Sequence, residues 1–208
     1  MLVELACDKF REKRFEFSSG LNVVLGDEKA TNSIGKSSLL MVIDFVFGGN
    51  SLLEHNIDIV EELGHHEYCF CFKFGDDKKF FKRATFSPEL VYICTKEYEE
   101  VEPISIEQFR ALLKSKYFLD HIDLSFRAIV SLYSRIWGKE NLDVKMPLHS
   151  HVKRKNVECI DDLLKLYEKF GSIKLLSKKV KDLNDEKSAL RSAFKQKLIT
   201  KTTKRKFR

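Results

Sequence analysis

The spacing of hydrophobic and polar positions changes along this chain, and each spacing predicts a different kind of element. Leu21 to Gly26 is a short, nearly continuous apolar run, which predicts a strand. Ser37 to Phe47 is apolar nearly all round and predicts a helix that packs against a sheet, and Gly48 to Asn50 should end it. The first fifty residues therefore predict a strand, a loop and a buried helix.

From residue 67 the pattern has a period of two. Three runs rich in aromatic and β-branched residues are separated by turn-forming clusters at Gly75–Asp77 and Ser87–Glu89. This alternation predicts an antiparallel meander with strands at Glu67–Phe74, Lys79–Phe86 and Leu90–Thr95.

A helical period returns after the meander. Ile106–Tyr117 is predicted to be a helix with Ser105 as its N-cap, and Gln108 in its first turn is expected to be exposed. Ile122–Trp137 predicts a second helix. Its Arg127 could face a phosphate, but an arginine reaching outward from a core helix is the preferred interpretation.

The last part of the chain predicts an amphipathic helix over 156–199 and a basic tail over 200–208, after a head at 1–150. Either a coiled-coil arm or a helix packed on the head explains the pattern. Ser177 and Lys187 interrupt the apolar series. Its members, at mostly three- and four-residue steps, are Leu163, Leu166, Phe170, Ile173, Val180, Leu183, Leu190 and Phe194.

The loop between the predicted strand and helix carries the candidate chemistry. Gly35 would let the backbone approach an anion closely, the N–H groups at the start of the helix would point at it, and Lys36 would reach the outer phosphates. The hydroxyl of Ser37 is placed to bind Mg²⁺, which makes it the candidate metal ligand. The predicted Mg-ATP site consists of Gly26, Asn32, Ser33, Ile34, Gly35, Lys36, Ser37 and Ser38.

One position departs from the usual phosphate-loop spacing. The pattern G-x-x-x-x-G-K-[ST] requires glycine at position 30, where this chain has Ala30, and Gly26 lies four residues further upstream. A chance Gly-Lys-Ser triplet at a helix start is the alternative, but the apolar strand and helix on either side favour a nucleotide site. Asn32 and Ser33 could add phosphate contacts or only shape the turn.

Phe15 to Gly49 resembles the ATP-binding-cassette ATPases of the SMC, RecF and RecN kind, and the lengthened loop looks most like a bacterial SMC-like branch. The resemblance lies in the order of SSGLNVVLG, NSIGKSS and LLMVIDFVFGG. It implies an α/β head, with a P-loop NTPase-like first lobe and an antiparallel meander, whose arm leaves near residue 156. It also implies that Asp8 to Arg14 lie beside the base or ribose.

The same resemblance implies that the chain is incomplete for hydrolysis. No Ser-Gly-Gly signature occurs, and no apolar strand ending in Asp-Glu appears after residue 150. No convincing glutamine loop stands near Ser125–Arg127. The pairs Glu61-Glu62 and Glu99-Glu100 are expected to be exposed instead of catalytic. An ATPase would then need a second lobe, from another polypeptide or a second copy.

Charge is distributed unevenly. The chain carries a net charge of +6, and residues 174–208 hold 13 Lys or Arg against 3 Asp or Glu, so the basic character belongs to the C-terminal part. Such a segment could bind DNA through phosphates without reading sequence, or be a solvated helix face. No apolar run is long enough to cross a membrane, and no signal peptide stands at the N-terminus, so a cytoplasmic protein without a membrane partner is expected.

The five cysteines include no C-x-x-C pair, and Cys69 and Cys71 are expected to be small apolar residues on one side of a strand. The histidine pairs His65-His66 and His149-x-His151 lack ligands at zinc spacing, so surface or loop histidines are expected.

Three functions follow from these patterns. The first is an ATP-binding, SMC-like head fragment acting in DNA repair, chromosome maintenance or defence against foreign DNA. The second is a non-catalytic interaction module that pairs through its C-terminal helix and touches nucleic acid through its basic tail. The third is a small-molecule kinase, which the meander after the loop and the lack of an arginine-rich lid argue against.

Overall fold

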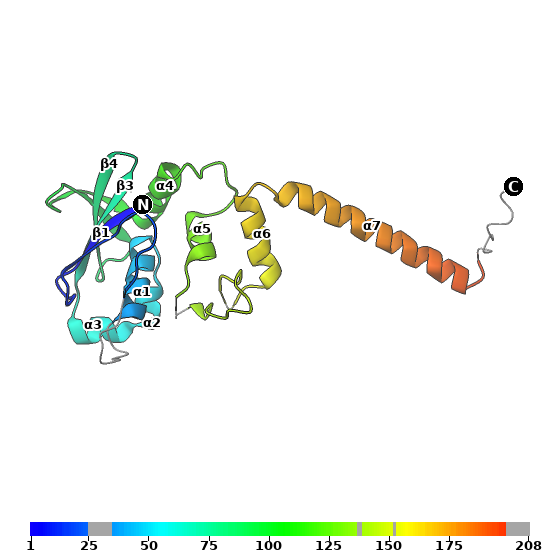
Figure 1. Cartoon of the computed structure of the whole chain (residues 1–208), viewed down its shortest axis with the longest axis horizontal. Coiled ribbons are helices and arrows are strands. Elements are labelled where there is room, and N and C mark those ends of the chain that lie inside the picture. Colours follow the sequence, from blue (N-terminus) through cyan, green and yellow to red (C-terminus); the bar gives the residue numbers. More distant parts are fainter. Residues whose placement is uncertain (25–34, 137–138, 152, 199–208) are drawn as a thin grey trace. The chain divides into compact units, whose positions relative to one another are not determined.

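The computed structural model describes residues 1–24, 35–136, 139–151 and 153–198 (Figure 1). The chain divides into two compact units, Met1–Leu166 and Tyr167–Arg208. The first unit holds a sheet and six helices among its described residues, and the second holds one long helix.

The sheet of the first unit has six strands in the order β2-β1-β3-β4-β5-β6, and every pairing between them is antiparallel. β3 and β4 form the longest ladder, from Glu67 opposite Ala84 to Phe74 opposite Asp77. The strands are β1 (Leu2–Ala6), β2 (Arg14–Glu16), β3 (Glu67–Phe74), β4 (Asp77–Ala84), β5 (Leu90–Cys94) and β6 (Glu100–Ser105).

The helices of the first unit fall between and after the strands. α1 to α3 separate β2 from β3, and α4 to α6 follow β6. Their bounds are α1 (Lys36–Val46), α2 (Ser51–His55), α3 (Ile57–Leu63), α4 (Ile106–Lys116), α5 (Phe126–Tyr133) and α6 (Asn156–Leu166).

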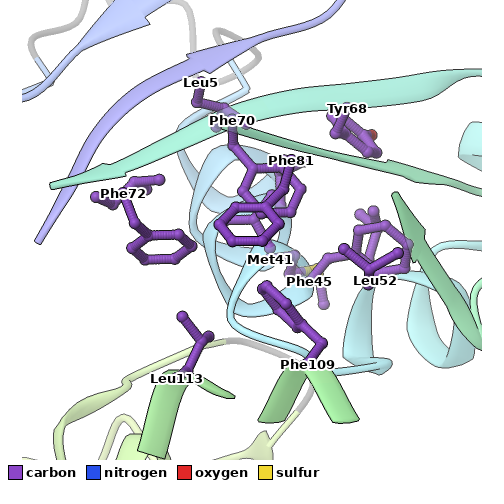
Figure 2. Close-up of a cluster of buried hydrophobic side chains, with 14 of the residues drawn as sticks. Leu5, Met41, Phe45, Leu52, Tyr68, Phe70, Phe72, Phe81, Phe109 and Leu113 are labelled. Carbon is purple, nitrogen blue, oxygen red and sulfur yellow. The ribbon is translucent and has the colours of Figure 1, made fainter. Parts of the chain in front are cut away.

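The core lies between one face of the sheet and helices α1 and α4 (Figure 2). The period of two places aromatic residues of β3 and β4 on this face. Phe70 stacks on Phe81 with ring centroids 5.8 Å apart, and Phe81 meets Phe109 of α4 edge-on at 5.2 Å. On the α1 side, Phe45 meets Tyr68 edge-on at 5.7 Å. This aromatic cluster fixes α1 against the sheet.

The coarse fold prediction is confirmed: the chain is mixed α/β, with an antiparallel meander and a C-terminal helix. The three predicted meander strands correspond to β3, β4 and β5. β6 was missed because Glu100 and Glu102 make it polar and Pro103 interrupts it, as an edge strand tolerates. The parallel strands typical of P-loop NTPases are not seen among the described strands.

The strand predicted at Leu21–Gly26 does not form over its described part. Residues 21–24 belong to no strand, and Leu21 is 87% exposed. The side chain of Asn22 instead closes a turn: its Oδ1 accepts from the Ser18 N–H at 3.0 Å, and its Nδ2 donates to the Ser18 carbonyl at 3.0 Å. The ladder positions beside β1 are already taken by β2 and β3. An apolar run alone therefore did not make a strand here.

The helices after the meander differ in length from the predictions. α4 matches its prediction, and its N-cap Ser105 forms a capping box with Gln108, which is exposed as expected. α5 is shorter than predicted because the hydroxyl of Ser125 accepts from the Ala128 N–H at 3.1 Å and starts the helix there.

The predicted C-terminal helix is interrupted. α6 ends at Leu166, and α7 (Phe170–Lys195) forms the second unit's helix. Glu168 between them has a positive φ of 57°, a conformation that an α-helix does not contain. Cys159 of α6 is fully buried, and α6 packs against α5, so this helix belongs to the first unit, whose compact body extends to Leu166 instead of ending near residue 150.

Candidate functional site

The candidate phosphate site is built on the start of α1. Gly35 is the N-cap, with φ 76° and ψ 16° in the left-handed region, and its carbonyl accepts the first helical hydrogen bond from the Leu39 N–H at 2.8 Å. A side chain added at Gly35 would meet open space, so the conformation alone favours glycine here.

The first turn of α1 presents groups suited to an anion. Lys36 and Ser37 are exposed and Ser38 is partly buried, and the first turn holds no acidic residue. Its backbone N–H groups carry the positive end of the helix dipole. The N–H groups of a helix start favour anions, and an ammonium and a hydroxyl beside them can add contacts to a phosphate.

The structure describes half of the predicted site residues. Gly35, Lys36, Ser37 and Ser38 are contiguous at the helix start. The other four predicted contacts lie outside the described residues; they are Gly26, Asn32, Ser33 and Ile34.

The opposite end of α1 is held by a guanidinium that the sequence analysis missed. Arg83 of β4 is fully buried, and its Nη1 donates to the carbonyls of Phe45 at 2.6 Å and Gly49 at 2.8 Å. Its Nε donates to the Pro88 carbonyl at 2.8 Å, and its Nη2 donates to Asn50 Oδ1 at 2.9 Å. The guanidinium carbon also lies 3.8 Å from the centre of the Phe45 ring. Arg83 therefore ties the sheet to the end of α1.

Two further arginines reach the same helix end. Arg110 of α4 donates twice to the Gly48 carbonyl, at 2.7 and 3.0 Å. Arg127 of α5 donates to the Phe47 carbonyl at 3.1 Å. Cations at the C-terminal end of a helix interact favourably with its dipole and satisfy carbonyls that lack helical partners. The three guanidiniums, from three different elements, together cap α1.

Arg127 also pairs with a buried carboxylate, so it does not reach outward as the sequence analysis preferred. Its Nη2 lies 2.5 Å from Asp44 Oδ1, and the ammonium of Lys139 lies 3.1 Å from the same oxygen. Asp44 is 1% exposed. A charge this deeply buried requires such partners.

The charges of this group shift one another's pKa. Burial alone would raise the pKa of Asp44, but the charges and hydrogen bonds of Arg127 and Lys139 outweigh it and hold the pKa below its usual value. Burial lowers the pKa of Lys139. Burial, together with the nearby Arg110 and Arg127, lowers the pKa of Arg83 to about 9, so Arg83 remains charged at neutral pH.

Gly49 allows this close arrangement. A Cβ at this position would lie 1.9 Å from Asp44 Oδ2 and 2.8 Å from Arg127 Nη2. The predicted helix terminator therefore has a second role, because only glycine leaves room for the buried carboxylate.

A second region bears on the nucleotide hypothesis. A cleft of about 440 Å³ lies between the loop after β1 and the start of β3, and its lining includes Asp8, Lys9, Lys13 and Arg14, which belong to the segment expected beside the base or ribose. Three of these four groups are basic, and Asp8 is acidic.

His66 lines the same cleft and lies in the loop before β3, as the expectation of surface or loop histidines allows, but its side chain is buried. It is 7% exposed, and its ring nitrogens lie 2.8 Å from the Tyr68 hydroxyl and 2.8 Å from the Gly64 carbonyl. The contact with Tyr68 of β3 helps to bury this ring, and no local sequence pattern predicted that burial.

Within the described ranges, the glutamate pairs and the cysteines show no sign of a catalytic or metal site. Glu61, Glu62, Glu99 and Glu100 are exposed. All five cysteines are free, with Cys71 buried and Cys69 partly buried on the same side of β3. Among the described residues, no group of three or more His, Cys, Asp or Glu side chains could hold a metal ion.

No helix in the part of the chain that the structure describes is both long and apolar enough to span a membrane. Comparison with protein-family models and with curated proteins returned no match to this chain.

Proposed function

We propose that this chain binds Mg-ATP at the start of α1 and is a head fragment of an SMC-like ATPase. The observation that carries the proposal is the first turn of α1. There the left-handed Gly35 precedes an exposed lysine and an exposed serine, in a turn without acidic residues. By the resemblance, Lys36 contacts the β- and γ-phosphates and Ser37 ligates Mg²⁺.

The anchoring of α1 supports this role. A helix that is already fixed against its neighbours needs little further ordering when a phosphate binds at its start. Here the helix body packs on the sheet and its far end is tied by Arg83, Arg110 and Arg127. Binding at the start of α1 therefore requires little reorganisation of this helix.

Hydrolysis is proposed to need a complementing partner. The signature and the catalytic carboxylate of the resembled family have no counterpart in this sequence, so a second lobe or a second copy would supply them. By the same resemblance, the process served is DNA repair, chromosome maintenance or defence against foreign DNA in the cytoplasm. The basic C-terminal part is the proposed DNA contact.

The test is Mg-ATP binding by titration calorimetry on the full chain and on Lys36→Ala. Loss of one charge-assisted contact to phosphate should weaken binding by about 10- to 100-fold. Lys96→Ala is the matched control, because Lys96 is an exposed lysine in the turn after β5. Turnover in the same samples should stay near background. A folded wild-type chain that binds no Mg-ATP would refute the proposal.

A second candidate is favoured by a different observation, the exposed apolar residues of α7. A non-catalytic interaction module would pair through this helix and bind nucleic acid through the basic tail. Lys36→Ala separates the two candidates, since it should abolish the function of an ATP-dependent head and leave an interaction module unaffected.

A further inference from the structure

The apolar face of α7 has a regular spacing that the structure leaves uncovered. Counting from Ile173, steps of three and four residues give an unbroken heptad series, which we call the α7 stripe: Ile173, Leu176, Val180, Leu183, Lys187, Leu190 and Phe194. Five of its apolar members are between 42% and 63% exposed, and none of the described residues of α7 is buried. The d position of this heptad is Leu176, so the neighbouring Ser177 does not interrupt the series.

The residue types of the α7 stripe match a two-stranded coiled coil. Ile173 and Val180 occupy a positions, and Leu176, Leu183 and Leu190 occupy d positions. Apolar residues repeated at a and d form the seam of a coiled coil, although the preference of branched residues at a for two strands is known for parallel dimers. The remaining question is which helix is the second strand and in which direction it runs.

We propose that α7 pairs with α7 of a second copy of this chain as an antiparallel coiled coil. In one register, Val180 lies opposite Leu183 of the second copy and Ile173 lies opposite its Leu190. Lys187 then lies opposite Leu176, where its stem covers apolar surface and its ammonium reaches water. Each a position from Ile173 to Lys187 meets a d position, and Phe194 lies beyond the paired segment.

Charge selects this register among the antiparallel ones. It brings the flanking Lys179 of each copy beside Glu186 of the other, which makes two attractive pairs. A shift of one heptad in one direction brings Glu186 beside Glu186, and a shift in the other direction brings Lys179 beside Lys179. Like charges at these flanking positions oppose pairing.

Charge also disfavours the parallel arrangement. An in-register parallel pair would place Lys187 against Lys187 within the apolar core. Two facing ammonium groups in a core layer cost binding free energy, whereas the antiparallel register separates them.

The test is sedimentation analysis of the full chain over a concentration series, with a charge swap. Lys179→Glu and Glu186→Lys should each turn two attractive pairs into two repulsive ones and weaken the dimer by about tenfold. The double variant restores both pairs with exchanged signs and should regain wild-type affinity. A parallel dimer would not be rescued, because Lys179 would face Asn184 and Glu186 would face Arg191.

The matched controls are Lys178→Glu and Asp185→Lys, which make the same changes in charge on the outer face of the same helix. They should leave the dissociation constant unchanged, and circular dichroism should show intact helix in every variant. A chain that remains monomeric throughout the series overturns the proposal, as does a double variant no tighter than the single ones. Neither result depends on nucleotide binding at α1.

Discussion

Removal of the Arg83 guanidinium tests how α1 is held. Arg83→Ala withdraws the donors from the carbonyls of Phe45, Gly49 and Pro88 in a fully buried setting. It also leaves the space of one large side chain unfilled. Each buried acceptor left without a donor costs about 1–3 kcal/mol, so the loss of these contacts is expected to cost about 3–5 kcal/mol in total. For a chain of this size, that loss lowers Tm by about 6–20 °C.

The assay is urea unfolding of wild-type, Arg83→Ala and Arg83→Lys. The lysine variant keeps a charge but has no planar fork to reach several carbonyls, so its stability should fall between the other two. Arg14→Ala is the control, because that arginine is 55% exposed and pairs with Glu4 at 3.6 Å, a contact worth about 1 kcal/mol or less. If Arg83→Ala lost less than about 1 kcal/mol, Arg83 would not be what anchors α1.

Two further predictions concern the buried carboxylate beside it. Gly49→Ala should lower the free energy of unfolding by about 2 kcal/mol or more, because the added methyl would overlap Asp44 Oδ2. The control is Gly171→Ala in α7, where the added methyl meets open space and the change should be neutral or stabilising. Equal urea midpoints for the two variants would contradict the close packing at Gly49. The folded pKa of Asp44 is held below its unfolded value, so its stabilisation is present above about pH 4 and is lost as the pH falls through the folded pKa. Urea midpoints measured from neutral to acid pH should therefore fall less steeply in Asp44→Asn than in wild-type, and parallel slopes would remove Asp44 from the acid response.

Local patterns predicted the parts of this protein whose structure depends on neighbours in sequence. The period of two over residues 67–95 predicted the meander because alternation decides which side chains face the core. Ser105 predicted the start of α4 because its capping box closes within four residues. The Gly-Lys-Ser triplet marked the start of α1 for the same reason, since the left-handed glycine and the helix start are adjacent.

Local patterns failed where long-range contacts outweigh them. Leu21–Val24 is apolar enough for a strand, yet both sides of β1 are occupied and Asn22 closes a turn instead. Arg127 looked like an arginine that reaches outward, because nothing near it in sequence shows that Asp44, more than eighty residues away, needs a partner.

The sequence by itself therefore determined the antiparallel meander, the starts of α1 and α4 and the amphipathic character of α7, because each depends on spacing within a few residues. Only the tertiary structure decided that Arg83, Arg110 and Arg127 meet at the end of α1. Their carbonyl partners become available only once the helix stops and the sheet, α4 and α5 pack around it. A buried guanidinium is stable only where those acceptors converge, and no local pattern encodes that convergence.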